Sequence, residues 1–186
     1  MAKLIYVMNT SLDCYVEDEQ GDFGWSAPNE EVNSYINELH SSVGTYLYGR
    51  RMYDAMVFWE TGYAAHNLPQ FLLDWAKLWQ AATKIVYSRS LTEARSARTQ
   101  IVREFDAEAV RRLKGNAERH ITINGPELAA HALRADLVDE VQMIVCPVVV
   151  GGGKRFFPDG VRADLELVDE RGFSNGVVGL RYAVRG

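Results

Sequence analysis

The stretch ITINGPEL, residues 121–128, decides the fold of this chain. Residues 121–123 form a β-branched run typical of a strand, and Asn124-Gly125-Pro126 is a turn. Leu128 begins a set of apolar positions at helical spacing, with Pro126 in the opening turn. A strand that passes directly into a helix predicts an α/β fold with a parallel sheet.

The same turn offers a place for an anion. Gly125 lets the backbone approach a ligand closely, and the unpaired amides at the start of the following helix stabilise a phosphate. Alternatively, the glycine serves only the geometry of the turn. Glu127 favours the helix dipole but repels a phosphate.

Strand and helix patterns alternate along the rest of the chain. Apolar and β-branched runs predict strands at residues 4–8, 45–48, 84–87 and 100–103. Helical spacing predicts helices that begin near Pro28, at 52–59, behind Pro69, and between Asp106 and Gly115. Residues 138–150 are extended and leave the sheet near Pro147, and 164–169 with 177–184 form a hairpin. The expected architecture is a three-layer α/β/α sandwich with a mostly parallel mixed sheet and a C-terminal antiparallel hairpin.

Composition limits the class of protein. The 186 residues are 47% apolar and 24% charged, which is ordinary globular composition and excludes a disordered chain. We expect a single domain over residues 1–186, because no linker interrupts the pattern. The net charge of −5 argues against nucleic acid as a partner. No apolar stretch is long enough for a membrane helix, so we expect no membrane partner.

The two cysteines, Cys14 and Cys146, lie far apart without zinc-ligand spacing, so we expect no metal. We interpret them as reduced, buried thiols of a cytoplasmic protein, with a single disulfide as the alternative. The N-terminal apolar run is too short for a signal peptide.

Basic residues follow two of the predicted strands. Gly49-Arg50-Arg51 comes after one strand and Ser88-Arg89 after another. Guanidinium groups at strand ends can hold phosphates, and a Ser-Arg pair can hold a phosphate monoester such as the one that separates NADP from NAD. Alternatively, each arginine pairs with a neighbouring acid such as Asp54 or Glu93.

Other catalytic patterns fail on spacing. The glycines at 151–153 with Lys154 lack the further glycine and the Ser or Thr of a P-loop. No GxGxxG follows the first strand, and no GxSxG is present, which disfavours a Rossmann site and a serine hydrolase. The four histidines have no evident nucleophile partner.

Six segments in order resemble the dihydrofolate reductase-like superfamily, and most closely the bacterial branch that shares its fold with the reductase domain of riboflavin biosynthesis. The segments are Ser11-Leu12-Asp13, Asp22-Phe23-Gly24-Trp25, Tyr48-Gly49-Arg50-Arg51-Met52-Tyr53, Tyr87-Ser88-Arg89, Asn124-Gly125-Pro126-Glu127-Leu128 and Leu137-Val138-Asp139-Glu140. They span nearly the whole chain.

This resemblance implies a reductase that uses NADPH. It assigns the cofactor's phosphates to Gly49, Arg50 and Arg51, and the adenosine 2′-phosphate to Ser88 and Arg89. The pyrophosphate falls to Asn124 and Gly125 with the helix start at Glu127 and Leu128. Gly152 and Lys154 are expected near the nicotinamide or the substrate.

The sequence offers two acids as candidates for the catalytic group. The superfamily's pterin-binding acid follows a tryptophan and a proline, and that register gives Trp25, Pro28 and Glu30. We expect Glu30 or Asp13 to bind the substrate or relay a proton, and Trp25 to stack on a flat ring. Alternatively, Glu30 only stabilises the helix dipole. The usual glycine after Ser-Leu-Asp is Cys14 here, and the usual paired glycines become Asn124-Gly125.

Two functions follow. The first is NADPH-dependent reduction of a C=N or C=O bond in a small heterocycle. A pterin-like substrate would rely on Glu30, and a ribosylamino-pyrimidine-like one on Lys154 or Arg155. With no zinc-binding deaminase domain ahead of it, we expect no bifunctional riboflavin enzyme. The alternative is a catalytically inactive, nucleotide-binding, oligomerising protein. We expect a homodimer, with 141–150 and the terminal hairpin as its interface.

Overall fold

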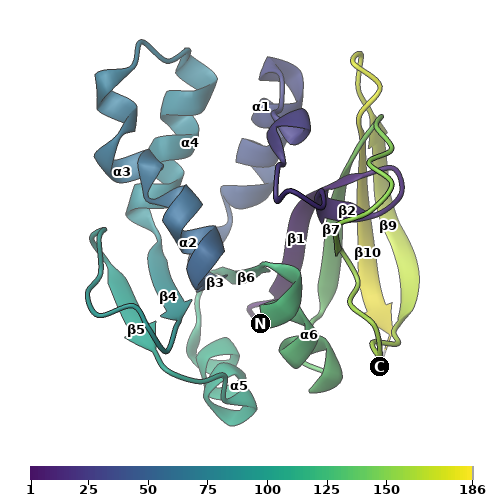
Figure 1. Cartoon of the computed structure of the whole chain (residues 1–186). Helices are drawn as coiled ribbons and strands as arrows, with labels where there is room; N and C mark the ends of the chain where they lie inside the picture. Colours follow the sequence, from purple (N-terminus) through teal and green to yellow (C-terminus); the bar gives the residue numbers. More distant parts are fainter. Residues whose placement is uncertain (186) are drawn as a thin grey trace.

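The computed structural model describes residues 1–185, which form one large mixed sheet and a small two-stranded sheet, with helices packed around them (Figure 1). The strand order of the large sheet is β5-β4-β3-β6-β1-β7-β10-β9. Its strands are β1 (Leu4–Ser11), β3 (Val43–Gly49), β4 (Thr83–Tyr87), β5 (Thr99–Val102), β6 (His120–Asn124), β7 (Glu140–Cys146), β9 (Asp164–Gly172) and β10 (Val178–Arg185). Pairing is parallel from β5 to β7 and antiparallel from β7 to β9, which confirms the predicted sheet.

Four helices begin where the sequence predicts, near Pro28, behind Pro69, after Asp106 and at Pro126, whereas the helix predicted at 52–59 is two short helices that begin at Arg50 and Phe58. The helices are α1 (Glu30–His40), α2 (Arg50–Met56), α3 (Phe58–Thr61), α4 (Gln70–Ala81), α5 (Ala107–Asn116) and α6 (Pro126–Arg134), with 3₁₀ turns η1 (Gly24–Ser26) and η2 (Tyr63–Ala65). Asn29 caps α1 by accepting from the Val32 amide, and Asp106 caps α5. The prediction that Gly115 ends α5 was wrong, because the helix continues through Asn116. Within residues 1–185, no helix combines the length and apolarity that crossing a bilayer requires.

Helices cover both faces of the sheet, which confirms the three-layer α/β/α sandwich. Side chains of β3 alternate between the layers, as expected for a strand buried on both faces. Leu47 packs in the core that includes α5 and α6, whereas Tyr46 and Tyr48 pack in the core formed with α2 and α4. A third core joins α1 to β7 and to Phe173 and Val177 in the turn between β9 and β10. Figure 1 shows α1 to α4 above and α5 with α6 below.

The segment 141–150, predicted as part of a dimer interface, lies on a strand only up to Cys146, and that strand is not an edge of the sheet. Residues 140–146 form β7, which pairs with β1 on one side and β10 on the other, so its backbone is already fully used. The chain leaves the sheet at Pro147, as predicted. The edge strand of the C-terminal hairpin is β9, where Leu167 and Val168 are about half exposed.

The structure contains a small second sheet that the sequence pattern did not predict. It pairs β2 (Tyr15–Glu17) with β8 (Lys154–Arg155), so part of the expected glycine loop at 151–154 is strand. Cys14, in the turn before β2, has φ of 66°, a left-handed conformation that explains why glycine is the favoured residue there. Cys14 is exposed, so its predicted burial was wrong, whereas Cys146 is buried and both thiols are free.

Candidate functional site

Three turns meet at the carboxyl ends of neighbouring strands. Gly49 at the end of β3 pairs with Tyr87 of β4, and Tyr48 pairs with Asn124 of β6. This register places the turns at 49–51, 88–90 and 124–125 next to one another, as the fold predicts. The Arg50 Nη1 atom donates a hydrogen bond to Ser90 Oγ over 2.7 Å, which connects two of the turns.

Two glycines leave open space at these turns. A Cβ atom added at Gly49 or Gly125 would meet no atom within 4 Å. Gly125 has φ of 103°, a conformation that L side chains rarely adopt, and it precedes α6 without a side-chain cap. The first backbone amides of α6, at Glu127 and Leu128, therefore form the positive end of the helix dipole. Open backbone at a helix start suits a pyrophosphate, so these residues fit the dinucleotide that the sequence implies.

Surface carboxylates already contact two of the arginines, Arg50 and Arg89. Arg50 lies 3.5 Å from Asp54, and Arg89, whose side chain is 81% exposed, lies 3.0 Å from Glu104. The pairing alternative is therefore correct for Arg50 and Asp54, but Arg89 pairs with Glu104 rather than Glu93. Exposed ion pairs contribute about 0–1 kcal/mol each, so a phosphate can compete for these guanidinium groups.

Ser88 stabilises the turn that follows β4. It is buried, and its Oγ accepts hydrogen bonds from the backbone amides of Ser90 and Leu91. Arg103 Nη1 donates to the Ser88 carbonyl oxygen over 2.9 Å. These contacts fix the loop that carries Arg89. Asn124 likewise ties the sheet together, because its Nδ2 donates to the Val7 carbonyl oxygen over 2.8 Å.

A cavity of about 680 Å³ opens beside the turns. Its floor is formed by residues of β1, β3, β6 and β7, and its walls come from α1 to α4 and the segment around η1. Five aromatic side chains line it, Phe23, Tyr48, Phe58, Trp59 and Trp75. Its volume and apolar lining are typical of a small-molecule site.

The charged side chains that line the cavity form one cluster, which we call the cavity rim and define as Glu17, Arg51 and Lys154. Arg51 binds both oxygens of the Glu17 carboxylate, at 3.0 and 3.2 Å. Lys154 Nζ lies 3.5 Å from Glu17 and 3.0 Å from Glu127 at the start of α6. Within residues 1–185, Glu17 is the one carboxylate that lines the cavity, and the sequence patterns did not single it out.

His40 and Asn33 are the buried polar side chains that α1 contributes to the cavity. Burial lowers the pKa of His40 to about 4, so its imidazole is neutral at pH 7. Its Nδ1 lies 3.1 Å from the Tyr46 hydroxyl. Asn33 Nδ2 donates to Asn37 Oδ1 and to the Phe71 carbonyl oxygen, both at 3.3 Å. Neither side chain carries charge.

The two acids expected from the sequence lie apart from this cavity. Glu30 is exposed in the first turn of α1 and is absent from the lining, whereas Asn33, about one turn later, belongs to it. Trp25 does not line it either, and its indole donates to the Asp22 carbonyl oxygen.

Asp13 instead joins two segments of chain. Its carboxylate accepts hydrogen bonds from the amides of Val150, at 3.2 Å, and Gly151, at 2.8 Å. The hydrogen bond from Ser11, followed by those from these amides, lowers the pKa of Asp13, although partial desolvation opposes the shift. Asp13 is therefore ionised at neutral pH. Gly152 in the same segment lies against Glu19, whose Oε1 would be 2.7 Å from an added Cβ.

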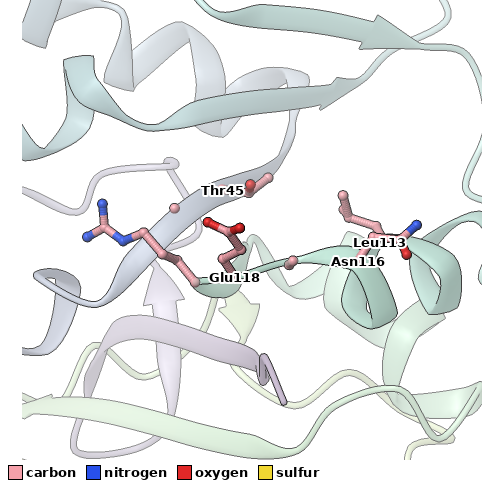
Figure 2. A pocket seen from close by; sticks show the side chains of 7 residues that line it. Thr45, Leu113, Asn116 and Glu118 are labelled. Carbon is pink, nitrogen blue, oxygen red and sulfur yellow. The ribbon is translucent and has the colours of Figure 1, made fainter.

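A second, shallower hollow of about 290 Å³ lies at the start of β3 (Figure 2). It is lined in part by Thr45, Leu113, Asn116 and Glu118. The start of β3 is the opposite end of the strand from Gly49, so this hollow is separate from the three turns. Within residues 1–185, no group of three or more His, Cys, Asp or Glu is placed to hold a metal ion.

Fold and site together define an α/β sandwich with a cavity at the carboxyl ends of its parallel strands. The chain belongs to the RibD C-terminal domain family, whose sequence pattern matches residues 2–179. It is 29% identical over 182 residues to the uncharacterized protein YyaP of Bacillus subtilis, covering 97% of this chain and 94% of YyaP. The proposed resemblance to the riboflavin reductase branch is thereby confirmed.

Solved structures share the fold at low sequence identity. A riboflavin biosynthesis protein from Shewanella sp. PV-4 aligns with a TM-score of 0.77 at 20% identity, covering 99% of both chains. RibD of Acinetobacter baumannii aligns with a TM-score of 0.72 at 14% identity, covering all of this chain and 58% of that one. A deaminase and 5-amino-6-(5-phosphoribosylamino)uracil reductase from Thermotoga maritima aligns with a TM-score of 0.68 at 13% identity, covering 99% of this chain and 57% of that one.

Proposed function

We propose that this protein is an NADPH-dependent reductase of a C=N or C=O bond in a small heterocyclic substrate. The observation that carries the proposal is the meeting of open glycine turns and arginines with an aromatic cavity at one end of the sheet. A dinucleotide needs both features, because its phosphates require amides and cations while its nicotinamide requires a cavity that excludes water.

The proposed roles follow the geometry of the turns. Arg50 and Arg51 bind phosphates beside Gly49, and the amides of α6 behind Gly125 bind the pyrophosphate. Arg89 on its loop binds the 2′-phosphate and gives the preference for NADPH over NADH. NADPH supplies a hydride to the substrate when bound. Water at the cavity rim supplies the proton, since Asp13 and Glu30 lie outside the lining.

A thermal shift comparison of NADPH with NADH tests the binding half of the proposal. A ligand present at 100 times its Kd stabilises the folded protein by about 2.7 kcal/mol, which raises Tm by about 5–10 °C for a chain of this size. Arg50→Ala and Arg89→Ala should each reduce the shift, and Arg89→Ala should also erase the preference for NADPH. Arg185→Ala is the control, because Arg185 is exposed at the opposite end of the sheet.

Turnover is tested by NADPH consumption with a panel of pterins and pyrimidinones. Loss of NADPH together with a reduced product supports the reductase. Binding of NADPH without turnover of any acceptor supports the alternative, a nucleotide-binding protein of the same fold that has lost catalysis. An unchanged Tm with both dinucleotides contradicts both functions.

We also propose that the protein forms a homodimer through the C-terminal hairpin. The supporting observation is the exposed edge of β9 with its half-exposed Leu167 and Val168. Light scattering coupled to size-exclusion chromatography measures the mass directly. Leu167→Lys should shift a dimer toward the monomer, and a monomeric wild type contradicts this proposal.

A further inference from the structure

Charged and apolar side chains line different parts of the cavity. We call the part formed by α1, α3 and α4 the helical wall. It consists of Asn33, Ile36, Leu39, His40, Phe58, Trp59, Leu72 and Trp75. Every member is neutral at pH 7, since burial keeps His40 unprotonated. The helical wall therefore offers stacking surface and an amide, but no cation.

The cations of the cavity are already occupied. Arg51 and Lys154 of the cavity rim both contact Glu17, and Lys154 also contacts Glu127. The Glu17 side chain is 17% exposed, so it is more strongly desolvated than a surface acid. Arg51 is also the side chain proposed to bind a cofactor phosphate, so a substrate anion entering here would have to compete with that phosphate or displace a carboxylate from these cations. An anion placed against the helical wall would lose its hydration without gaining a counter-ion, which costs several kcal/mol.

We propose that the acceptor substrate is an uncharged, flat ring compound that carries no phosphate or carboxylate. This inference rests on the proposed function and identifies the class of substrate that the same cavity takes. The aromatic rings of Trp59, Trp75 and Phe58 provide the surface against which such a ring packs. The phosphoribosyl group in the name of the Thermotoga maritima reductase has no matching cation on this helical wall.

The reduction of such a substrate requires one hydride and one proton. A ring C=O gains a hydride at carbon from NADPH and a proton at oxygen from water, which yields an alcohol and NADP⁺. The C=O π bond breaks and new C–H and O–H bonds form. No charged group on the substrate takes part in this step.

A matched pair of ring compounds tests the proposal by calorimetric titration. Isatin is a neutral bicyclic heterocycle with a ketone, and isatin-5-sulfonate adds one anion to the same ring. We expect wild type to bind isatin at least about tenfold more tightly, the ratio that about 1.4 kcal/mol produces. Titrations with and without NADPH give a readout that does not depend on turnover.

Two substitutions on α4 test whether the preference for isatin depends on the helical wall. Leu72 belongs to the helical wall, whereas Leu73 next to it is similarly half-buried but does not line the cavity. Leu72→Lys adds a cation to the wall and should narrow or reverse the preference for isatin. Leu73→Lys should leave the preference unchanged. Circular dichroism and Tm establish that both variants fold, and the wild-type ratio stands as a test if either does not.

Several outcomes overturn the proposal. They are equal or tighter binding of the sulfonate by wild type, no isatin binding at millimolar concentration, and the same change in both lysine variants. Failure of the proposed function looks different. In that case isatin still binds selectively while NADPH produces no thermal shift. If NADPH shifts Tm but the sulfonate binds as well as isatin, the reductase assignment stands and the substrate class falls.

Discussion

The neutral state of His40 predicts a measurable loss of stability in acid. His40 is 4% exposed at the end of α1, where its ring stacks on Tyr46 and meets the edge of Trp75. Burial lowers its pKa from 6.5 to about 4. The unfolded chain keeps the ordinary value and so binds a proton at higher pH than the folded chain does.

The sign and size follow from this difference. A depressed folded pKa contributes stability that is fully present above pH 6.5 and is lost as the pH falls toward 4. Each pKa unit corresponds to about 1.4 kcal/mol, so His40 accounts for a loss of about 3 kcal/mol across this window. That loss is a large fraction of the 5–15 kcal/mol that is typical of a folded domain.

Urea unfolding at a series of pH values between 7.5 and 4.5 measures this contribution. His40→Asn keeps a polar atom near the Tyr46 hydroxyl but cannot titrate, so its free energy of unfolding should fall less steeply with acid. His66→Asn changes an exposed histidine and should follow the wild-type profile. Carboxylates titrate in all three proteins, so the difference between profiles isolates His40. Parallel profiles for wild type and His40→Asn would show that the pKa of His40 is the same in the folded and the unfolded chain.

Four further predictions concern two glycines, one helix cap and the two thiols. Gly153→Ala should lower the free energy of unfolding by more than about 2 kcal/mol in urea, because φ is 129° and the new Cβ would lie 2.0 Å from a backbone oxygen. Gly49→Ala should leave that free energy nearly unchanged but weaken the NADPH thermal shift, because its Cβ enters open space; equal stability losses in both variants would contradict this reasoning. Asp106→Ala should cost about 1 kcal/mol by removing the cap of α5, and an unchanged urea midpoint would show that the cap contributes nothing. A thiol reagent should label Cys14 in the native protein and Cys146 only after unfolding, whereas equal native labelling would contradict the burial of Cys146.

The sequence was sufficient to predict the elements whose signals are local. Gly125 and Pro126 mark the start of α6, and Asp106 marks that of α5, because caps and turns depend on neighbouring residues. The gathering of the turns at 49–51, 88–90 and 124–125 was also predictable, since parallel strands bring their carboxyl ends to one edge.

The acid in the cavity was not predictable from local pattern. Glu17 lies on a strand of three residues, and its neighbours in space, Lys154 and Arg51, come from distant parts of the chain. Such a short antiparallel pair forms only because the rest of the fold brings its partners together. The Trp25 and Glu30 register failed to mark the lining for a different reason. Spacing along the chain does not determine how α1 is rotated, and the rotation brings Asn33 rather than Glu30 to the cavity.

The two halves of the candidate site depend on different kinds of contact. The turns that hold Gly49 and Gly125 are fixed by backbone pairing of β3, β4 and β6, whereas the helical wall is fixed by side-chain packing. A change at Leu72 or Trp59 therefore leaves the strand register intact, and a change at Arg89 leaves the wall intact. Leu72→Lys should accordingly alter the choice between isatin and its sulfonate without changing the NADPH thermal shift, and Arg89→Ala should do the reverse. Sites that share no contacts add independently, so the double variant should show both effects at full size. If either effect is smaller in the double variant than in the corresponding single variant, the helical wall and the turns are coupled. The inference that the turns bind the dinucleotide independently of the wall would then be wrong.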